Sequence, residues 1–245
     1  MNIVVIIQAR MDSTRLKGKV LFDLEGKTVL AHVIERCKAM TSANDVIVAI
    51  PDKQNDDPIQ KEVEKAGIFC YRGSETNLLL RFYEAAKLRA ADVVVRVTSD
   101  CPLVDPELGD LMISKFLESD GTDFCSNSMI RNFPRGLDVE VFSFAALEYA
   151  FLNATLNFEM EHVTPYIYQH PEIFKLTPFT AHEDNSKYRW TLDTPEDWLL
   201  IKEIYRRLYV PGQIFPWRTA LQLIKDYPQL QSVNNMIEQK KLSDP

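Results

Sequence analysis

The stretch that decides the fold reads Ile3-Val4-Val5-Ile6-Ile7-Gln8-Ala9-Arg10-Met11-Asp12-Ser13-Thr14-Arg15-Leu16-Lys17-Gly18-Lys19-Val20-Leu21. Residues 3–7 are apolar and mostly β-branched, in a run too short for a helix, which is typical of a buried parallel strand. The polar segment that follows would then form a loop at the carboxyl end of that strand, where open α/β sheets bind ligands. This loop predicts a site for a small polyanion, because it sets four basic residues against one acid: Arg10, Arg15, Lys17 and Lys19 against Asp12.

The totals describe an ordinary globular chain. Its 245 residues are 46% hydrophobic, enough for one large α/β domain, and its net charge of −7 argues against general binding to nucleic acids or anionic membranes. Four cysteines without a C-x-x-C pair indicate reduced thiols rather than disulfides or a zinc site. No apolar run resembles a signal peptide or reaches transmembrane length, so we expect a soluble, cytoplasmic protein.

The order of the expected elements predicts the fold class. Strands are expected at 3–7, 45–50, 68–71 and 92–98, and they alternate with helices at 28–40, 58–66, 78–90 and 106–119. This alternation indicates βαβ units with right-handed crossovers and a mostly parallel sheet flanked by helices.

The pattern changes after residue 119. Strands are expected at 123–127, 138–143 and 189–192, helices at 144–153 and 158–169, and an extended segment at 174–180. We interpret residues 123–188 as a substrate-side or dimerisation subdomain within a single domain, 1–245. Helices at about 194–209 and 219–227 follow, and the tail, 229–245, is expected to be a peripheral helix.

The opening loop has the groups that a triphosphate requires. Guanidinium groups grip phosphate oxygens, and a lysine can neutralise a departing pyrophosphate. The alternative is a solvated basic loop without a ligand. The loop has neither a Walker nor a dinucleotide-binding glycine pattern, and no nucleophile elbow occurs in the chain.

Two aspartates follow expected strands and could share one Mg²⁺, which binds through one or two carboxylates plus phosphate oxygens. Asp100 could instead cap the next helix, but Asp105, directly before Pro106, is better placed for that role. Asp193 could also be a cap, but Thr194 suits the cap position better and would leave the Asp193 carboxylate free.

A weaker group of polar residues surrounds a Gly turn and could line a pocket for an anionic, hydroxyl-rich substrate: Arg131, Arg135, Asp138 and Glu140. A surface cluster of ion pairs explains the same pattern equally well. The four histidines show no metal-ligand spacing and read as structural or exposed.

Several blocks of the sequence, in order, resemble the CMP-sugar synthetases, the cytidylyltransferase family that includes CMP-KDO and acylneuraminate synthetases. The match is nearest to the branch called spore-coat polysaccharide biosynthesis protein F (SpsF). Besides residues 7–21, the matching blocks are Arg72-Gly73-Ser74-Glu75, Arg81-Phe82-Tyr83-Glu84-Ala85-Ala86, Thr98-Ser99-Asp100-Cys101-Pro102-Leu103, Gly136-Leu137-Asp138-Val139-Glu140-Val141-Phe142, Glu161-His162-Val163-Thr164-Pro165-Tyr166 and Arg189-Trp190-Thr191-Leu192-Asp193-Thr194-Pro195-Glu196-Asp197. The family's usual glycine and proline in the first block are Asp12 and Lys17 here.

The resemblance implies a Rossmann-like nucleotide-diphospho-sugar transferase fold, a homodimer, and the use of CTP and Mg²⁺. It implies that CTP would be bound by residues of the first blocks: Ala9, Arg10, Ser13, Arg15, Lys19, Gly73, Ser74, Arg81 and Ser99. Asp100 and Asp193 would hold the metal and, with Arg10 and Lys19, form the catalytic set. The sugar would contact residues of the later blocks: Arg135, Asp138, Glu140, His162 and Arg189.

These observations together predict transfer of CMP from CTP to a sugar hydroxyl, most simply that of an acidic sugar for surface glycan synthesis, with release of pyrophosphate. Two alternatives stay open. One is a nucleotidyltransferase that uses another nucleotide or a non-sugar alcohol. The other is a protein that binds a nucleotide-sugar without turnover.

Overall fold

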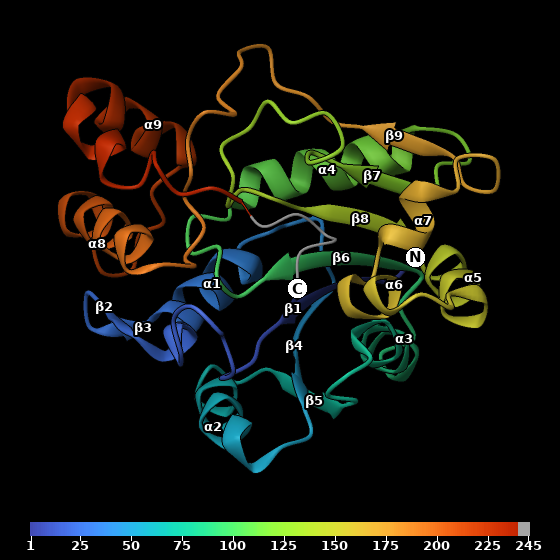
Figure 1. The fold of residues 1–245 in the computed structure, drawn as a ribbon. Helices are drawn as coiled ribbons and strands as arrows, with labels where there is room; N and C mark the ends of the chain where they lie inside the picture. Colours follow the sequence, from blue (N-terminus) through green and yellow to red (C-terminus); the bar gives the residue numbers. More distant parts are fainter. Residues whose placement is uncertain (240–245) are drawn as a thin grey trace.

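The computed structural model describes residues 1–239 and builds them around a seven-stranded sheet (Figure 1). The strand order is β5-β4-β1-β6-β8-β7-β9, and only β8 runs opposite to the rest. The strands are β1 (Ile3–Gln8), β4 (Asp45–Pro51), β5 (Phe69–Gly73), β6 (Val93–Thr98), β7 (Phe124–Ser126), β8 (Glu140–Ser143) and β9 (Leu176–Pro178). The mostly parallel sheet predicted from the alternating pattern is therefore confirmed.

Helices cover both faces of the sheet. One face carries α1 (Val29–Lys38), α2 (Asp57–Lys65), α4 (Pro106–Glu118), α8 (Pro195–Leu208) and α9 (Trp217–Asp226); the other carries α3 (Leu78–Leu88), α5 (Phe144–Asn153), α6 (Asn157–His162) and α7 (Pro165–Gln169). Short 3₁₀ turns, η1 (Lys19–Leu21), η2 (Gln54–Asp56) and η3 (Pro228–Val233), and the hairpin of β2 (Asp23–Leu24) with β3 (Lys27–Thr28) complete the described chain.

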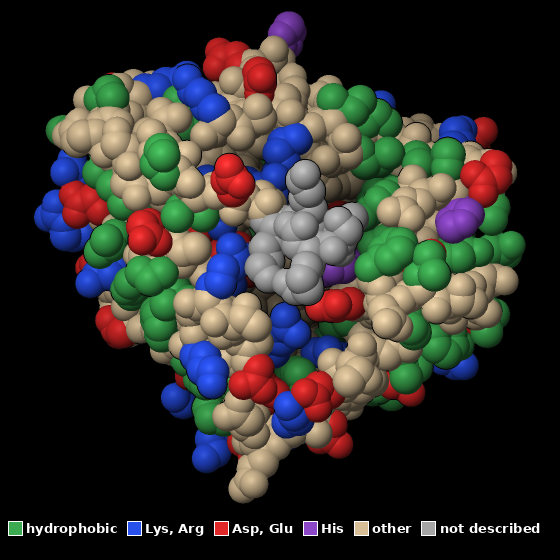
Figure 2. Space-filling model, in the orientation of Figure 1, with side chains coloured by type: hydrophobic (Ala, Val, Ile, Leu, Met, Phe, Trp, Pro, Cys, Tyr) green, Lys and Arg blue, Asp and Glu red, His purple; other side chains and the backbone are tan. Residues whose placement is uncertain are grey.

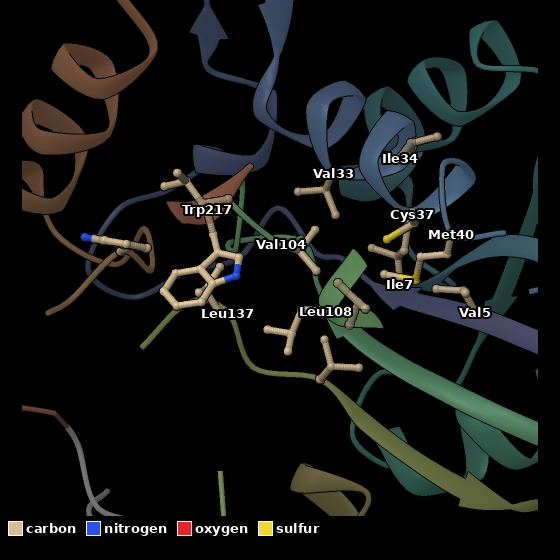
Figure 3. Close-up of a cluster of buried hydrophobic side chains, with 14 of the residues drawn as sticks. Val5, Ile7, Val33, Ile34, Cys37, Met40, Val104, Leu108, Leu137 and Trp217 are labelled. Carbon is tan, nitrogen blue, oxygen red and sulfur yellow. The ribbon is translucent and has the colours of Figure 1, made fainter. Parts of the chain in front are cut away.

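The central strand β1 is buried on both faces, as its apolar run predicts. Val5 and Ile7 point into one core with α1 and α4, shown in Figure 3, whereas Val4 and Ile6 point into the other core. Burying each such side chain contributes about 1.5–3 kcal/mol to folding. The two cores thereby fix the level at which β1 ends and its polar loop begins.

Two of the sequence predictions are wrong in detail. The expected helix 158–169 is split into α6 and α7 at Val163, whose φ is +71°, and Pro165 begins the second helix. The expected strand at 189–192 is not a strand of the sheet: Arg189 forms an isolated bridge with Arg135, and the Leu192 amide donates to the Asp100 carbonyl.

The tail also differs from its prediction. Residues 228–233 form the 3₁₀ turn η3 rather than a peripheral helix, and residues 240–245 of that expected helix lie outside the described range. None of the helices within residues 1–239 is long and apolar enough to cross a membrane.

Candidate active site

The loop after β1 brings a lysine between two carboxylates. Gly18, at φ +67°, turns the chain into η1, and Lys19 at the start of η1 is buried. Its Nζ donates to Asp100 Oδ2 and to Asp193 Oδ1, at 2.8 Å each. Three residues from distant parts of the sequence, all in the predicted catalytic set, therefore meet at the carboxyl end of β1 and β6.

Asp100 is held by its own strand end. The Thr98 hydroxyl donates to Asp100 Oδ1 at 2.7 Å, and the Leu192 amide donates to the Asp100 carbonyl at 2.8 Å. Burial alone would raise the pKa of Asp100, but the Lys19 ammonium and the Thr98 hydrogen bond outweigh it and lower the pKa. Burial would likewise lower the pKa of Lys19, but the two carboxylates raise it. Lys19 and Asp100 are therefore both charged at neutral pH.

Asp193 is not free, contrary to the sequence-based expectation. Its Oδ2 accepts a hydrogen bond from Arg189 Nη2 and forms an ion pair with Arg15 Nη2, each at 3.1 Å, while its Oδ1 accepts from Lys19. The predicted cap of the following helix is confirmed, because Thr194 accepts the amide hydrogen of Asp197 in a capping box. Three cations thus converge on one carboxylate.

Behind this carboxylate lies a second acid that the sequence reading treated only as part of a cap. Asp197 is fully buried, and it accepts from Arg189 Nε at 2.9 Å and from Arg189 Nη2 at 3.0 Å. Asn234, after η3, donates to Asp197 Oδ1 and to the Arg189 carbonyl, while Gln239 accepts from Arg189 Nη1. The C-terminal segment thereby orients Arg189, and Arg189 orients Asp193.

Across the loop, Arg81 on α3 is buried in an unusual way. It is 3% exposed, its Nε has no hydrogen-bond partner within residues 1–239, and burial together with the nearby Arg10 lowers the pKa of Arg81 to about 10. Arg10 itself is exposed. A Cβ on Gly73 would lie 2.6 Å from the Tyr71 ring and 3.2 Å from Arg81 Cγ, so glycine there leaves room for the arginine stem. Arg81 faces the like charge of Arg10 as well as the carboxylates of Asp56 and Glu75, which act in the opposite direction. An anion bound between the two arginines would relieve their repulsion.

The other predicted nucleotide-binding residues shape the loops at this edge. The amide of buried Ala9 donates to the Ala49 carbonyl, the amide of Ser99 donates to the Gln8 carbonyl, and the Ser74 hydroxyl accepts from the Asn77 amide. The side chain of Ser13 is half-buried.

Asp56, which the sequence reading missed, fixes the start of the opening loop. Its buried carboxylate accepts from the Met11 amide at 2.7 Å, and burial raises the pKa of Asp56. Asp12 is exposed and turned toward Asn55 and Lys53.

The predicted sugar-binding residues fall into two groups. Arg135 lies next to Arg189 through the isolated bridge, and burial together with Arg131 lowers the pKa of Arg135; Asp138 pairs with Arg131 at 2.6 Å. A cavity of about 140 Å³ is lined by Arg135, Arg189 and part of the C-terminal segment. This group is cationic and adjoins Asp193.

The second group lies on the α3 side of the sheet. Glu140 on β8 pairs with Arg96 on the neighbouring strand at 2.6 Å and accepts from the Thr164 hydroxyl at 3.0 Å. Thr164 follows a strained γ-turn at Val163, in which the Thr164 amide donates to the His162 carbonyl at 2.9 Å. Burial lowers the pKa of His162, and Arg96 and Arg10 act in the same direction. The imidazole therefore favours its neutral form beside these arginines.

The donors present fit Mg²⁺ bound together with a nucleotide. Asp100 and Asp193 each offer an oxygen 2.8 Å from the same nitrogen, so both can reach one ion. No group of three or more potential metal ligands occurs within residues 1–239, so phosphate oxygens would have to complete the coordination shell.

A larger cavity of about 450 Å³ lies between α4, α9 and residues 179–185, and none of the predicted site residues lines it. We assign the site by the converging charges rather than by cavity size. Figure 2 shows Lys, Arg, Asp and Glu side chains around the centre of the face that these loops form.

Comparison with known proteins agrees with this geometry. The family model described as cytidylyltransferase matches residues 4–241. The chain belongs to the cytidylyltransferase family. It is therefore a nucleotidyltransferase, and the family predicted from the sequence blocks is confirmed.

Individual members and structures show how far the likeness extends. SpsF of Bacillus subtilis is 35% identical over 213 residues, covering 84% of this chain and 87% of that protein. A solved cytidylyltransferase from Leptospira borgpetersenii has a TM-score of 0.91 and 34% identity, covering 98% of this chain and 100% of that one. A structure of CMP:2-keto-3-deoxy-manno-octonic acid synthetase with CTP has a TM-score of 0.65 and 17% identity, covering 85% of this chain and 100% of that one. The last likeness concerns the fold alone, and the predicted nucleotidyltransferase fold is confirmed.

Proposed function

We infer that this cytidylyltransferase transfers CMP from CTP to a sugar hydroxyl and releases pyrophosphate, with Mg²⁺ as its metal. The observation that carries the inference is the meeting of Lys19, Asp100 and Asp193 at one point of the sheet edge. The related synthetase that binds CTP and the similarity to SpsF support the choice of nucleotide and the sugar acceptor.

The chain's own residues contribute position and charge. Arg10, Arg15 and Arg81 would grip the phosphates, and Lys19 would neutralise the pyrophosphate as it leaves. Mg²⁺ held by Asp100 and Asp193 would supply Lewis-acid charge at the α-phosphate. The loops would hold the reacting groups in position, which is the main contribution of a protein to phosphoryl transfer.

The acceptor side favours an anionic sugar. Arg135, Arg131 and Arg189 lie together, and the pKa of Arg135 is lowered by burial and by its two cationic neighbours. An acceptor carboxylate would relieve this repulsion. We propose that the product serves glycan synthesis for the cell surface and that the reaction takes place in the cytoplasm.

We also propose that the enzyme is a homodimer that uses part of segment 123–188. Apolar side chains are exposed together around α5 and the segment before β9: Tyr149 (43%), Leu152 (70%), Leu156 (52%) and Ile173 (43%). Figure 2 shows hydrophobic side chains spread over the side where α5, α6 and α7 lie. Light scattering should give twice the chain mass, and Leu152→Lys with Leu156→Lys should lower it; Leu199→Lys, at an equally exposed leucine on α8, should not.

The reaction is tested by measuring pyrophosphate release from CTP in the presence of Mg²⁺ and a panel of acidic and neutral sugars. Asp100→Asn and Asp193→Asn should each lower the rate by at least about a hundredfold, because each removes one charge that faces the transition state. Asp226→Asn, a change of the same kind on the surface of α9, should leave the rate unchanged.

The outcome separates the alternatives. If GTP, ATP or UTP stabilises the protein against heat more than CTP does, the nucleotide is wrong. CTP that binds but stays intact with every sugar would mean a binding protein without turnover. Equal rates in Asp100→Asn and the parent would refute the metal-assisted mechanism.

A further inference from the structure

Lys19 occupies the position where the two carboxylates could share an ion. Its Nζ lies 2.8 Å from an oxygen of each, and the side chain is only 9% exposed. An ammonium group and a divalent cation compete for the same oxygens, since both are bound there by the same negative charge. The Lys19 contact and a metal contact at this place therefore exclude each other.

The local charge is already balanced. The carboxylates of Asp100, Asp193 and Asp197 face the cations Lys19, Arg15 and Arg189 through direct contacts. A free divalent cation would enter a neutral cluster and gain little attraction from it. Once the Lys19 ammonium withdraws, the cluster has one net negative charge. The space between Asp100 Oδ2 and Asp193 Oδ1 is then open to an ion.

A triphosphate offers Lys19 another place. The lysine stem is flexible, with a compact point charge at its end, and the loop that carries it also carries Arg10 and Arg15. Phosphate oxygens bound by this loop would accept hydrogen bonds from the Lys19 ammonium, because they would lie within reach of the lysine side chain on η1. The nucleotide would then remove Lys19 from the carboxylates at the moment at which it brings its own oxygens to the metal.

Building on the function inferred above, we propose that Lys19 is a place-holding cation that the metal replaces when the nucleotide binds. The divalent ion binds weakly to the nucleotide-free enzyme, and the ion and the nucleotide strengthen each other's binding by the same factor, as linkage requires. The device prevents the site from binding a metal ion without its substrate.

The test measures binding of Mn²⁺ to the full chain by the loss of its free EPR signal, without any turnover. The parent should bind Mn²⁺ weakly, and a non-hydrolysable α,β-methylene analogue of CTP should tighten binding by at least about tenfold. Lys19→Met should bind Mn²⁺ about tenfold more tightly than the parent without nucleotide, and the analogue should add much less.

Arg15→Met is the matched control. The variant removes a positive charge that neighbours the same Asp193 carboxylate. Arg15 contacts only Asp193 Oδ2, however, and does not lie between Asp100 and Asp193. It should change Mn²⁺ affinity without nucleotide by less than about threefold. Should Lys19→Met fail to fold, Lys19→Gln removes the charge while it keeps a hydrogen-bond donor, and the tightening by nucleotide in the parent is an independent readout.

Tight Mn²⁺ binding to the nucleotide-free parent would overturn the proposal, as would equal effects of Lys19→Met and Arg15→Met, which would show a general charge effect. Failure of the proposed function looks different: Mn²⁺ would then bind to neither the parent nor Lys19→Met even with the analogue. Adding Asp100→Asn to Lys19→Met should abolish the gained affinity, and retention of it would place the ion elsewhere.

Discussion

Two arginines of this protein are buried to the same extent but differ in their partners. Arg36 on α1 and Arg81 on α3 are each 3% exposed. Arg36 donates to the Tyr205 hydroxyl and to the Val104 and Phe215 carbonyls, and its guanidinium lies 4.5 Å from the Phe215 ring centre. Arg81 has a buried Nε with no partner in the described chain and the like charge of Arg10 nearby.

The hydrogen-bond partners of the two arginines distinguish a structural cation from one that is open to a ligand. A buried polar group without a partner costs about 1–3 kcal/mol, and more if it is charged, so a folded protein rarely keeps one unless something else binds to it. Arg36 joins α1 to the segments around α8 and α9, and its Nε and Nη1 both have acceptors. Arg81 is incomplete in the protein alone, and an anionic ligand would complete it.

The largest effect is expected at Arg36. Arg36→Met should lower the free energy of unfolding by about 3 kcal/mol, since it leaves two buried carbonyls without a donor and removes the cation–π contact. Urea unfolding followed by circular dichroism measures this. Affinity for the CTP analogue, measured below the unfolding transition, should stay within about twofold of the parent.

Arg81→Met should show the reverse. Stability should stay unchanged or rise by up to about 1 kcal/mol, because the variant removes a buried charge with an unpartnered donor. Affinity for the CTP analogue should fall by about ten- to a hundredfold, which is the range expected when a hydrogen bond to a charged group is lost. Calorimetric titration measures the affinity.

Together the two variants decide whether the comparison holds. If Arg81→Met lost as much stability as Arg36→Met and still bound the analogue normally, Arg81 would be a second structural arginine. If Arg36→Met lost nucleotide affinity while it remained folded, a buried arginine with hydrogen-bonded donors could not be assumed to be structural.

The sequence predicted that Lys19, Asp100 and Asp193 lie at one edge of the sheet, and the structure brings the three together. Asp100 directly follows β6 and Lys19 lies in the loop after β1, and parallel neighbours deliver such segments to one edge. Asp193 reaches the same place after a segment that is not a strand of the sheet, so its position follows only in part from this rule. The contacts that orient them were not predictable in the same way. Asp197 with Asn234 joins residues far apart in the chain, and no local pattern signals such a pair.

The same limit explains the two arginines. Arg36 lies in a helix whose periodicity shows one apolar face. The sequence does not reveal that further helices also cover the side of α1 on which Arg36 lies. Val163 was missed although Pro165 follows closely, because the apolar pattern continued across the break. The signal that could have found it is the proline, which begins a new helix.

The smallest expected effect concerns a third buried basic side chain, His32, which lies near Arg36. His32 is 3% exposed, and its Nε2 lies 2.7 Å from the Leu24 carbonyl. Burial lowers the pKa of His32 below 6.5, only partly offset by that hydrogen bond. Like Arg36, the imidazole is satisfied by its surroundings, but in the neutral form.

The direction of the pH effect follows from linkage. Below pH 6.5 the unfolded chain takes up a proton at His32 while the folded chain does not until the pH falls through its lower pKa, so stability decreases with falling pH across that interval. His32→Gln lacks this proton uptake. Between pH 7.5 and 5.5 the parent should therefore lose about 1 kcal/mol more unfolding free energy than the variant.

Urea unfolding of both proteins at a series of pH values gives the slope of unfolding free energy against pH for each. The difference between the two slopes removes the contribution of groups that titrate in both proteins. His182→Gln, at an exposed histidine, is the matched control and should follow the parent. A His32→Gln slope equal to that of the parent would mean that the Arg36 region accepts a second positive charge without penalty. The satisfied hydrogen bonds around Arg36 would then say nothing about the charge that this region tolerates, and the contrast with Arg81 would rest on the unpartnered Nε alone.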